Sequence, residues 1–291
     1  MKRLIIAILI TTFFSCKETK KEVTEVALES DKIEKPAVKL YTFNGGTVMA
    51  NKLELFSQDT TYQGQSKEFA DPFYVIVHPK GTLMWDAGLP EGLVASPEPI
   101  TPPGGAFTIS RKDSVINQLK SIDMTPKDID YIALSHSHFD HTGHANVFNE
   151  STWLVQETEY DFITSDEVKN SGQGLYEAIQ ELTNVKKING DFDVFGDGSV
   201  VIKSMPGHTP GHQVLYLDLV ENGPMLLTGD LYHLYENREH KRVPSFNTDV
   251  TQTKASFEAF ETFVKEKDAK VFIQHAKKDF NKMPKAPEYL K

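Results

Sequence analysis

The stretch "LSHSHFDHTGH", residues 134–144, decides how the rest of this sequence is interpreted. It contains four of the ten histidines of the 291-residue chain, namely His136, His138, His141 and His144, together with one acidic residue, Asp140. A buried cluster of imidazoles and a carboxylate without a metal ion would cost several kcal/mol in desolvation and mutual crowding. The composition of this stretch therefore indicates a metal site rather than ordinary packing.

The spacing within this stretch indicates two neighbouring groups of ligands. His136 and His138 are two residues apart, so their side chains point the same way in an extended segment. Asp140 and His141 follow where the chain turns into a helix, and this turn presents a second pair of donors. Nitrogen and oxygen donors in adjacent pairs suit two metal ions a few ångströms apart. His144 would lie one turn into the helix, where we do not expect a ligand.

Four strand-like runs, three of them outside this stretch, end at a His or an Asp. "YIALSH" leads to His136, "VVIKSMPGH" to His208, "PMLLTGD" to Asp230 and "KVFIQH" to His275. Ligand sites collect beyond the carboxyl ends of strands because the strands hold the residues in place while the loops stay open. Four such ends predict one shared edge.

Short apolar runs predict a β-rich chain with a few helices. Two longer runs have helical spacing, Arg111–Ser121 and Thr253–Lys267, and the phenylalanines of the second are expected in the core. The expected strands are Val38–Phe43, Thr47–Ala50, Phe73–His78, Thr82–Trp85, Tyr131–Leu134, Thr152–Gln156, Val200–Ser204, Gln213–Leu219, Pro224–Leu227 and Val271–Gln274. We expect one folded domain over residues 38–291.

The first residues have a different character. "MKRLIIAILITTFFSC" has a basic start and an apolar run too short to cross a bilayer, as in a signal peptide over residues 1–15. A small residue followed by Cys16 resembles the lipid-attachment site of bacterial lipoproteins, although an ordinary secretory signal fits as well. Residues 16–37 are charged and predict a flexible tether. We therefore expect export, either to the periplasm or outer membrane as a lipoprotein, or into the medium.

The charge of the chain argues against nucleic acid as a partner. The formal net charge is −10 at pH 7. Binding to phosphate backbones needs clustered lysine and arginine. A membrane would be contacted only through a lipid on Cys16.

"HSHFDH" resembles the HxHxDH motif of the metallo-β-lactamase superfamily. The later segments "PGHTPGH", "LLTGD" and "IQHA" follow in that superfamily's order, and "WDAGL" resembles its strand-ending Asp-x-Gly at Asp86 and Gly88. The resemblance spans nearly all of the chain after Val38. It implies an α/β fold of the αββα type, in which two mixed β-sheets are flanked by helices.

The same resemblance implies a set of metal ligands and a mechanism. His136, His138 and His208 would bind a first divalent ion, and Asp140, His141 and His275 a second, with Asp230 bridging the two. A hydroxide shared by the two ions would be the nucleophile. Zinc is the default metal for such ligands, but iron, cobalt and manganese also fit them.

Within this superfamily, local segments resemble the N-acyl-homoserine lactonases. These segments are "WLVQETEYDF", "LLTGDLYHLYEN", "VPSFNTD" and "QHAKKDFNKMPKAPEYL". Cys16 is the only cysteine, so a β-lactamase with a cysteine ligand is excluded. The resemblance implies that a small molecule, an N-acyl-homoserine lactone, is the substrate. A glyoxalase II-like thioesterase and a non-catalytic metal-binding protein remain alternatives.

Two side chains are expected to take part beside the metals. Asp140 would carry a proton to the leaving oxygen, since it would lie near both the nucleophile and that oxygen. His233 occupies the place where many of these lactonases have a tyrosine that contacts the substrate carbonyl, and Tyr232 is the alternative. His212 is expected to be structural. The loop from Ser96 to Phe107 either contributes to the acyl-chain groove or is a surface connection.

Overall fold

Two β-sheets form the centre of residues 35–291, the part of the chain that this computed structural model describes. The first sheet contains β1 (Lys39–Ala50), β2 (Lys67–His78), β3 (Gly81–Trp85), β4 (Phe107–Ser110), β5 (Tyr131–Ala133), β6 (Thr152–Gln156), β7 (Val185–Ile188) and β13 (Tyr289–Leu290). The second contains β8 (Phe192–Asp193), β9 (Val200–Ser204), β10 (Gln213–Leu219), β11 (Gly223–Leu227) and β12 (Lys270–Phe272).

Both sheets are mixed. The first has the order β13-β1-β2-β3-β5-β6-β7, with β4 also pairing with β1. Its pairs are antiparallel up to β3 and parallel from β3 to β7. The second has the order β12-β11-β10-β9-β8, and only β11 and β12 are parallel.

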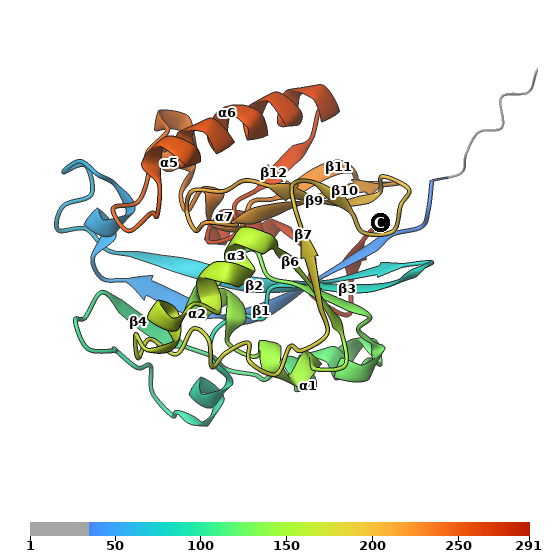
Figure 1. Cartoon of the computed structure of the whole chain (residues 1–291), viewed down its shortest axis with the longest axis horizontal. Coiled ribbons are helices and arrows are strands. Elements are labelled where there is room, and N and C mark those ends of the chain that lie inside the picture. Colours follow the sequence, from blue (N-terminus) through green and yellow to red (C-terminus); the bar gives the residue numbers. More distant parts are fainter. Residues whose placement is uncertain (1–34) are drawn as a thin grey trace, which may run out of the picture. The chain divides into compact units, whose positions relative to one another are not determined.

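Helices cover the outer face of each sheet (Figure 1). The α-helices of the described residues are α1 (Val115–Leu119), α2 (Phe139–Thr142), α3 (Glu157–Ile163), α4 (Asp166–Lys169), α5 (Tyr235–His240), α6 (Val250–Lys267) and α7 (Lys277–Lys282). Phe257 and Phe260 of α6 are fully buried against Tyr216 and Leu226 of the second sheet, as their helical spacing predicted. Val115 of α1 packs in the same way against the first sheet.

Apolar side chains fill the space between the two sheets. Ile76 and Leu83 from the first sheet and Ile202 and Leu215 from the second belong to one cluster, and all four are fully buried. Successive residues of a strand face opposite sides, so Val75 belongs instead to the cluster on the outer face of its sheet. The predicted αββα sandwich is confirmed.

Several element boundaries differ from the prediction. The first two predicted strands are one strand, β1, whose pairing with β2 shifts register between Asn44 and Thr47. The predicted helix Arg111–Ser121 begins only at Val115, because Ser114 caps it by accepting from the backbone N–H of Asn117. Strands β4, β7, β8 and β13 were not predicted.

The predictions for the N-terminus mostly lie outside the described residues. Residues 1–34 are not described, and three predictions fall on them. These are the signal peptide over residues 1–15, the lipid on Cys16 and most of the tether over residues 16–37, which all stay predictions. Residue 38, where the domain was expected to begin, is fully buried. None of the helices formed by residues 35–291 has the length and apolar character needed to span a bilayer.

Candidate metal centre

All seven side chains expected to bind metal lie together at one edge of the sandwich. His136 follows β5, His208 follows β9, Asp230 follows β11 and His275 follows β12. The others, His138, Asp140 and His141, lie at or within the short helix α2. Their donor atoms form two groups, and within each group these atoms lie within 4.8 Å of one another.

The first group consists of His136, His138, His208 and Asp230. The Nδ1 atom of His138 lies 2.9 Å from Nε2 of His136 and 3.1 Å from Nε2 of His208. Burial holds the pKa of His136 and of His138 well below its usual range, and the neighbouring imidazoles lower it further. Neutral imidazoles with converging nitrogens are the form in which histidine binds metal.

The second group consists of Asp140, His141 and His275, and Asp230 lies between the two groups. Oδ2 of Asp230 is 3.3 Å from Nε2 of His208, whereas Oδ1 is 2.8 Å from Nε2 of His275. Burial lowers the pKa of His275, but the carboxylates of Asp230 and Asp140 outweigh this and raise it to about 9. The electrostatic environment of the second group therefore favours a cation.

Two atoms at the centre test whether this set fits a metal ion. Nε2 of His141 and Oδ1 of Asp230 are buried 3.3 Å apart, and Oδ1 is also 2.8 Å from Nε2 of His275, yet neither atom forms a hydrogen bond of acceptable geometry among the described residues. Buried polar atoms nearly always have a partner. A divalent ion bound by nitrogen and oxygen donors would satisfy both atoms, and the set matches the ligands that zinc and similar metals accept. The residues present fit such ions.

Acceptors behind the ligands fix the orientation of the imidazoles. Three rings donate their outer nitrogen to such an acceptor, each at 2.9 Å: His141 to Asp86, His208 to the side chain of Asn247, and His275 to the carbonyl of Ala70. Partners of this kind fix the ring and raise its basicity. The sequence motif pointed to Asp86, but nothing local marked the other two acceptors.

Glu159 organises the site although it was not among the predicted site residues. It is buried in the first turn of α3 and accepts hydrogen bonds from two backbone N–H groups, those of Ser137 at 2.9 Å and Gly211 at 2.8 Å. These residues belong to the loops that carry His138 and His208. One carboxylate thus ties together two loops that lie far apart in the sequence.

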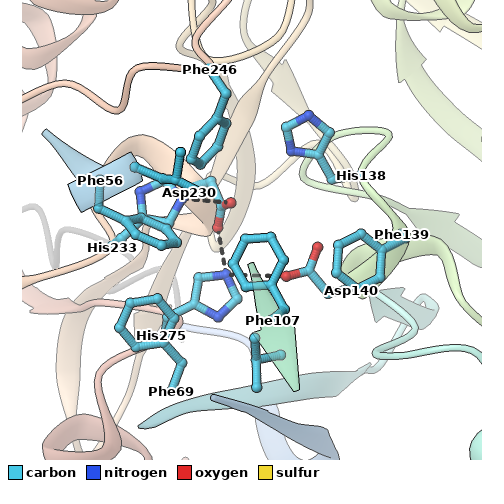
Figure 2. Close-up of a pocket in the computed structure, with 12 residues that line it drawn as sticks. Phe56, Phe69, Phe107, His138, Phe139, Asp140, Asp230, His233, Phe246 and His275 are labelled. Atoms are coloured by element: carbon cyan, nitrogen blue, oxygen red, sulfur yellow. Dashed lines mark hydrogen bonds and ion pairs between the residues drawn. The ribbon is translucent and has the colours of Figure 1, made fainter. Parts of the chain in front are cut away.

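An apolar cavity of about 270 Å³ opens beside the two groups (Figure 2). Four of the expected metal ligands line it, namely His138, Asp140, Asp230 and His275. The other lining residues are Val48, Leu55, Phe56, Phe69, Phe107, Phe139, His233 and Phe246. Phe107, the last residue of the predicted loop, is the first residue of β4 and lines the cavity, whereas residues 96–106 do not line it. Cavities of this type, largely apolar with a few polar groups, are typical small-molecule sites.

The two candidates for contacting a substrate carbonyl are placed differently. Tyr232 points away from the cavity: its ring stacks on Phe257 and its hydroxyl donates to Glu261, so the alternative that named it is wrong. His233 lies in the cavity wall, with Nε2 2.9 Å from Oδ2 of Asp230. Because an ionised carboxylate only accepts, this nitrogen donates to Asp230. Its contact with a substrate stays a prediction.

The histidines outside the predicted ligand set take other roles. His212 is structural, as expected: its Nδ1 donates to the carbonyl of Met205, and its Nε2 accepts from the backbone N–H of Asp230, each at 3.0 Å. His212 thereby orients the loop that carries Asp230. His144 lies outside both groups, 3.4 Å from a carboxylate oxygen of Glu91.

Comparison with known proteins shows the family to which this chain belongs. The family model described as the metallo-beta-lactamase superfamily matches residues 71–275. The chain belongs to the metallo-β-lactamase superfamily. This membership agrees with the resemblance of its sequence motifs and with the two facing sheets.

Two of the relatives found by sequence are N-acyl homoserine lactonases. An N-acyl homoserine lactonase from Bacillus sp is 30% identical over 259 residues, which cover 87% of this chain and 98% of that protein. The N-acyl homoserine lactonase AttM from Rhizobium radiobacter is 28% identical over 262 residues, with the same coverage. The chain therefore belongs to the N-acyl homoserine lactonase family.

Solved structures agree with this assignment. An N-acyl homoserine lactone hydrolase with the product N-hexanoyl-L-homoserine bound at its catalytic metal centre has a TM-score of 0.75 and 29% identity, and the match covers 87% of this chain and 98% of that one. A variant of AiiA from Bacillus thuringiensis with N-decanoyl-L-homoserine bound at the active site has the same TM-score and coverage at 28% identity.

Proposed function

We propose that this metallo-β-lactamase family member hydrolyses the lactone ring of N-acyl-homoserine lactones and uses two divalent ions, zinc by default. The observation that carries the proposal is the position of Asp230, whose two carboxylate oxygens face different groups of ligands at the floor of an apolar cavity. Two bound ions would polarise the lactone carbonyl and lower the pKa of a shared water molecule toward neutrality.

The residues of the chain supply binding and proton transfer. The aromatic lining would hold the acyl chain, because burying apolar surface is favourable by about 25 cal/mol per Å². Asp140 lines the cavity, and its carboxylate lies 3.8 Å from Nε2 of His275. From this position it would lie near both a water molecule bound at the ligands and a leaving ring oxygen, and it would carry the proton between them. His233 would hold Asp230 in place by its hydrogen bond.

The cavity favours a lactone over the thioester alternative. S-lactoylglutathione carries carboxylates, which cationic side chains would recognise. None of the residues that line this cavity within residues 35–291 is a lysine or an arginine. An acyl chain attached to an uncharged ring matches the aromatic walls better.

A substrate panel tests the proposal. Purified full-length protein with its bound metals quantified should open N-acyl-homoserine lactones and release the corresponding acyl-homoserines, with turnover of S-lactoylglutathione, a phosphodiester and a β-lactam at least about a hundredfold slower. The ring-opened product is measured by mass spectrometry. Preferential turnover of the thioester would replace the proposal with a thioesterase. Bound metal without turnover of any substrate would indicate a binding protein.

We further propose, from the sequence alone, that the enzyme is exported and carries a lipid on Cys16. The support is the basic start, the short apolar run and the small residue before Cys16. Cys16→Ser should move the protein from the membrane fraction to the soluble exported fraction of expressing cells, as seen by immunoblot. Wild-type protein in the soluble fraction would refute the lipid, and retention in the cytoplasm would refute export.

A further inference from the structure

Asp71, in the middle of β2, is a buried carboxylate that the proposed reaction does not use. Its side chain is fully buried, and neither carboxylate oxygen has a hydrogen-bond partner among the described residues. Leaving an ionised carboxylate in this condition is costly, and such groups are found paired or beside a metal. The position of Asp71 therefore requires a physical explanation.

The backbone places Asp71 directly beside the second group of ligands. The preceding residue, Ala70, forms two hydrogen bonds with His275: its carbonyl accepts from Nδ1 at 2.9 Å, and its N–H donates to the carbonyl of His275 at 3.2 Å. On its other side, Oδ2 of Asp71 lies close to Gly45, 3.4 Å from where a β-carbon would stand. Asp71 thus lies behind the ligands, away from the open cavity.

No cationic group is hydrogen-bonded to Asp71 among the described residues. The pKa of Asp71 is raised to about 8 by burial and by the neighbouring carboxylate of Asp140, and the nearby imidazoles and guanidinium offset this increase only in part. Arg111 is the nearby cationic side chain, but it donates to the backbone carbonyls of Ala87 and Asp113 at 3.1 and 3.0 Å. Its Nη2 is also buried without a hydrogen-bond partner among the described residues. A cation at the second group would supply the missing positive charge.

We propose that Asp71 is an outer counter-charge of the second metal ion, a positioning residue that strengthens its binding without touching it. The inference rests on the two-ion centre proposed above. Outer partners that are hydrogen-bonded to metal ligands typically contribute 10- to 100-fold to metal affinity, and we expect a buried charge beside the ligands to have an effect of the same order. Asp71 would contribute by charge, whereas Asp86 contributes by orienting a ring.

Zinc release from the full chain tests the inference. Wild-type and Asp71→Asn protein are loaded with zinc and titrated with a chromophoric chelator, which reports each release step. We expect Asp71→Asn to lower the affinity for one of the two zinc ions about 10- to 100-fold. The affinity for the other ion should stay within about threefold of wild type. Glu261→Gln is the matched control: it removes the same charge from a half-buried carboxylate that Arg238 already pairs, and both zinc ions should stay as in wild type.

A second variant separates charge from fold. Asp71→Leu replaces the unpaired carboxylate with an apolar side chain of the same branching, so the metal-free protein should melt at the same or a higher temperature, while the affinity for one zinc ion falls as in Asp71→Asn. Unchanged affinity for both ions in both variants would overturn the inference, and so would equal weakening of both ions. If wild-type protein binds fewer than two zinc ions, the two-ion centre fails, and this inference fails with it.

Discussion

His208→Ala is expected to abolish lactone hydrolysis, with kcat/KM falling at least about a thousandfold. His208 is almost fully buried, its Nε2 faces His138 and Asp230, and its other nitrogen is hydrogen-bonded to Asn247. Removal of the ring leaves the first group short of one ligand and leaves Asn247 without its partner. The measurement is steady-state hydrolysis of an N-acyl-homoserine lactone, with bound metal determined on the same samples.

His240→Ala provides the matched control for this substitution. His240 is exposed at the end of α5 and belongs to neither group of ligands, so its loss should leave kcat/KM within about twofold of wild type, as is usual for surface changes. If His208→Ala kept a tenth or more of wild-type activity with normal metal content, His208 would not be a ligand.

Gly143→Ala is expected to destabilise the fold by about 3 kcal/mol or more. The backbone of Gly143 is ordinary, with φ −58°, so the obstacle is space rather than strain. A β-carbon here would lie 2.2 Å from the carbonyl carbon of Leu89 and 2.3 Å from the nitrogen of Pro90. These are backbone atoms that cannot rotate away, and α2 would have to move with Asp140 and His141. The free energy of unfolding in denaturant measures the effect.

Gly92→Ala is the comparison for the effect of an added methyl group. Gly92 lies in the short 3-10 helix Glu91–Ala95, and a β-carbon there would meet no atom within 4 Å. Its substitution should change stability by less than about 1 kcal/mol, and alanine's helix preference favours a small gain. Equal effects of the two substitutions would mean that the contact of Gly143 with the loop after β3 is not tight.

The sequence predicted the edge where the site lies because the relevant signals are local. The run "PMLLTGD" contains both the strand β11 and the carboxylate that follows it, and "KVFIQH" does the same for β12 and His275. Apolar composition identifies the strand, and the polar residue just beyond it marks the ligand. The convergence of these ends then follows from the layered fold.

Elements without a local signal were missed. In β7, "VKKI", two of four residues are exposed lysines, and its strand conformation comes from parallel pairing with β6. β13 has two residues, paired with β1 from the other end of the chain. Such short strands exist because a partner edge is available. Only the tertiary structure shows this.

The cavity and the choice between two neighbours also required the structure. Phe56, Phe69, Phe107 and Phe246 come from four separate segments, and no spacing in the sequence links them. Tyr232 and His233 are adjacent, yet one faces the helix α6 and the other faces the cavity. Side-chain direction in an irregular loop depends on backbone angles that residue type does not determine.

The number of metal ions bound per chain tests the two-ion centre most directly. Purified full-length protein, dialysed against metal-free buffer and analysed by inductively coupled plasma mass spectrometry, should retain about two divalent transition-metal ions per chain while it opens N-acyl-homoserine lactones. Active protein that retains one metal ion or none per chain would contradict the two-ion centre, because the two carboxylate oxygens of Asp230 would then not face two bound ions.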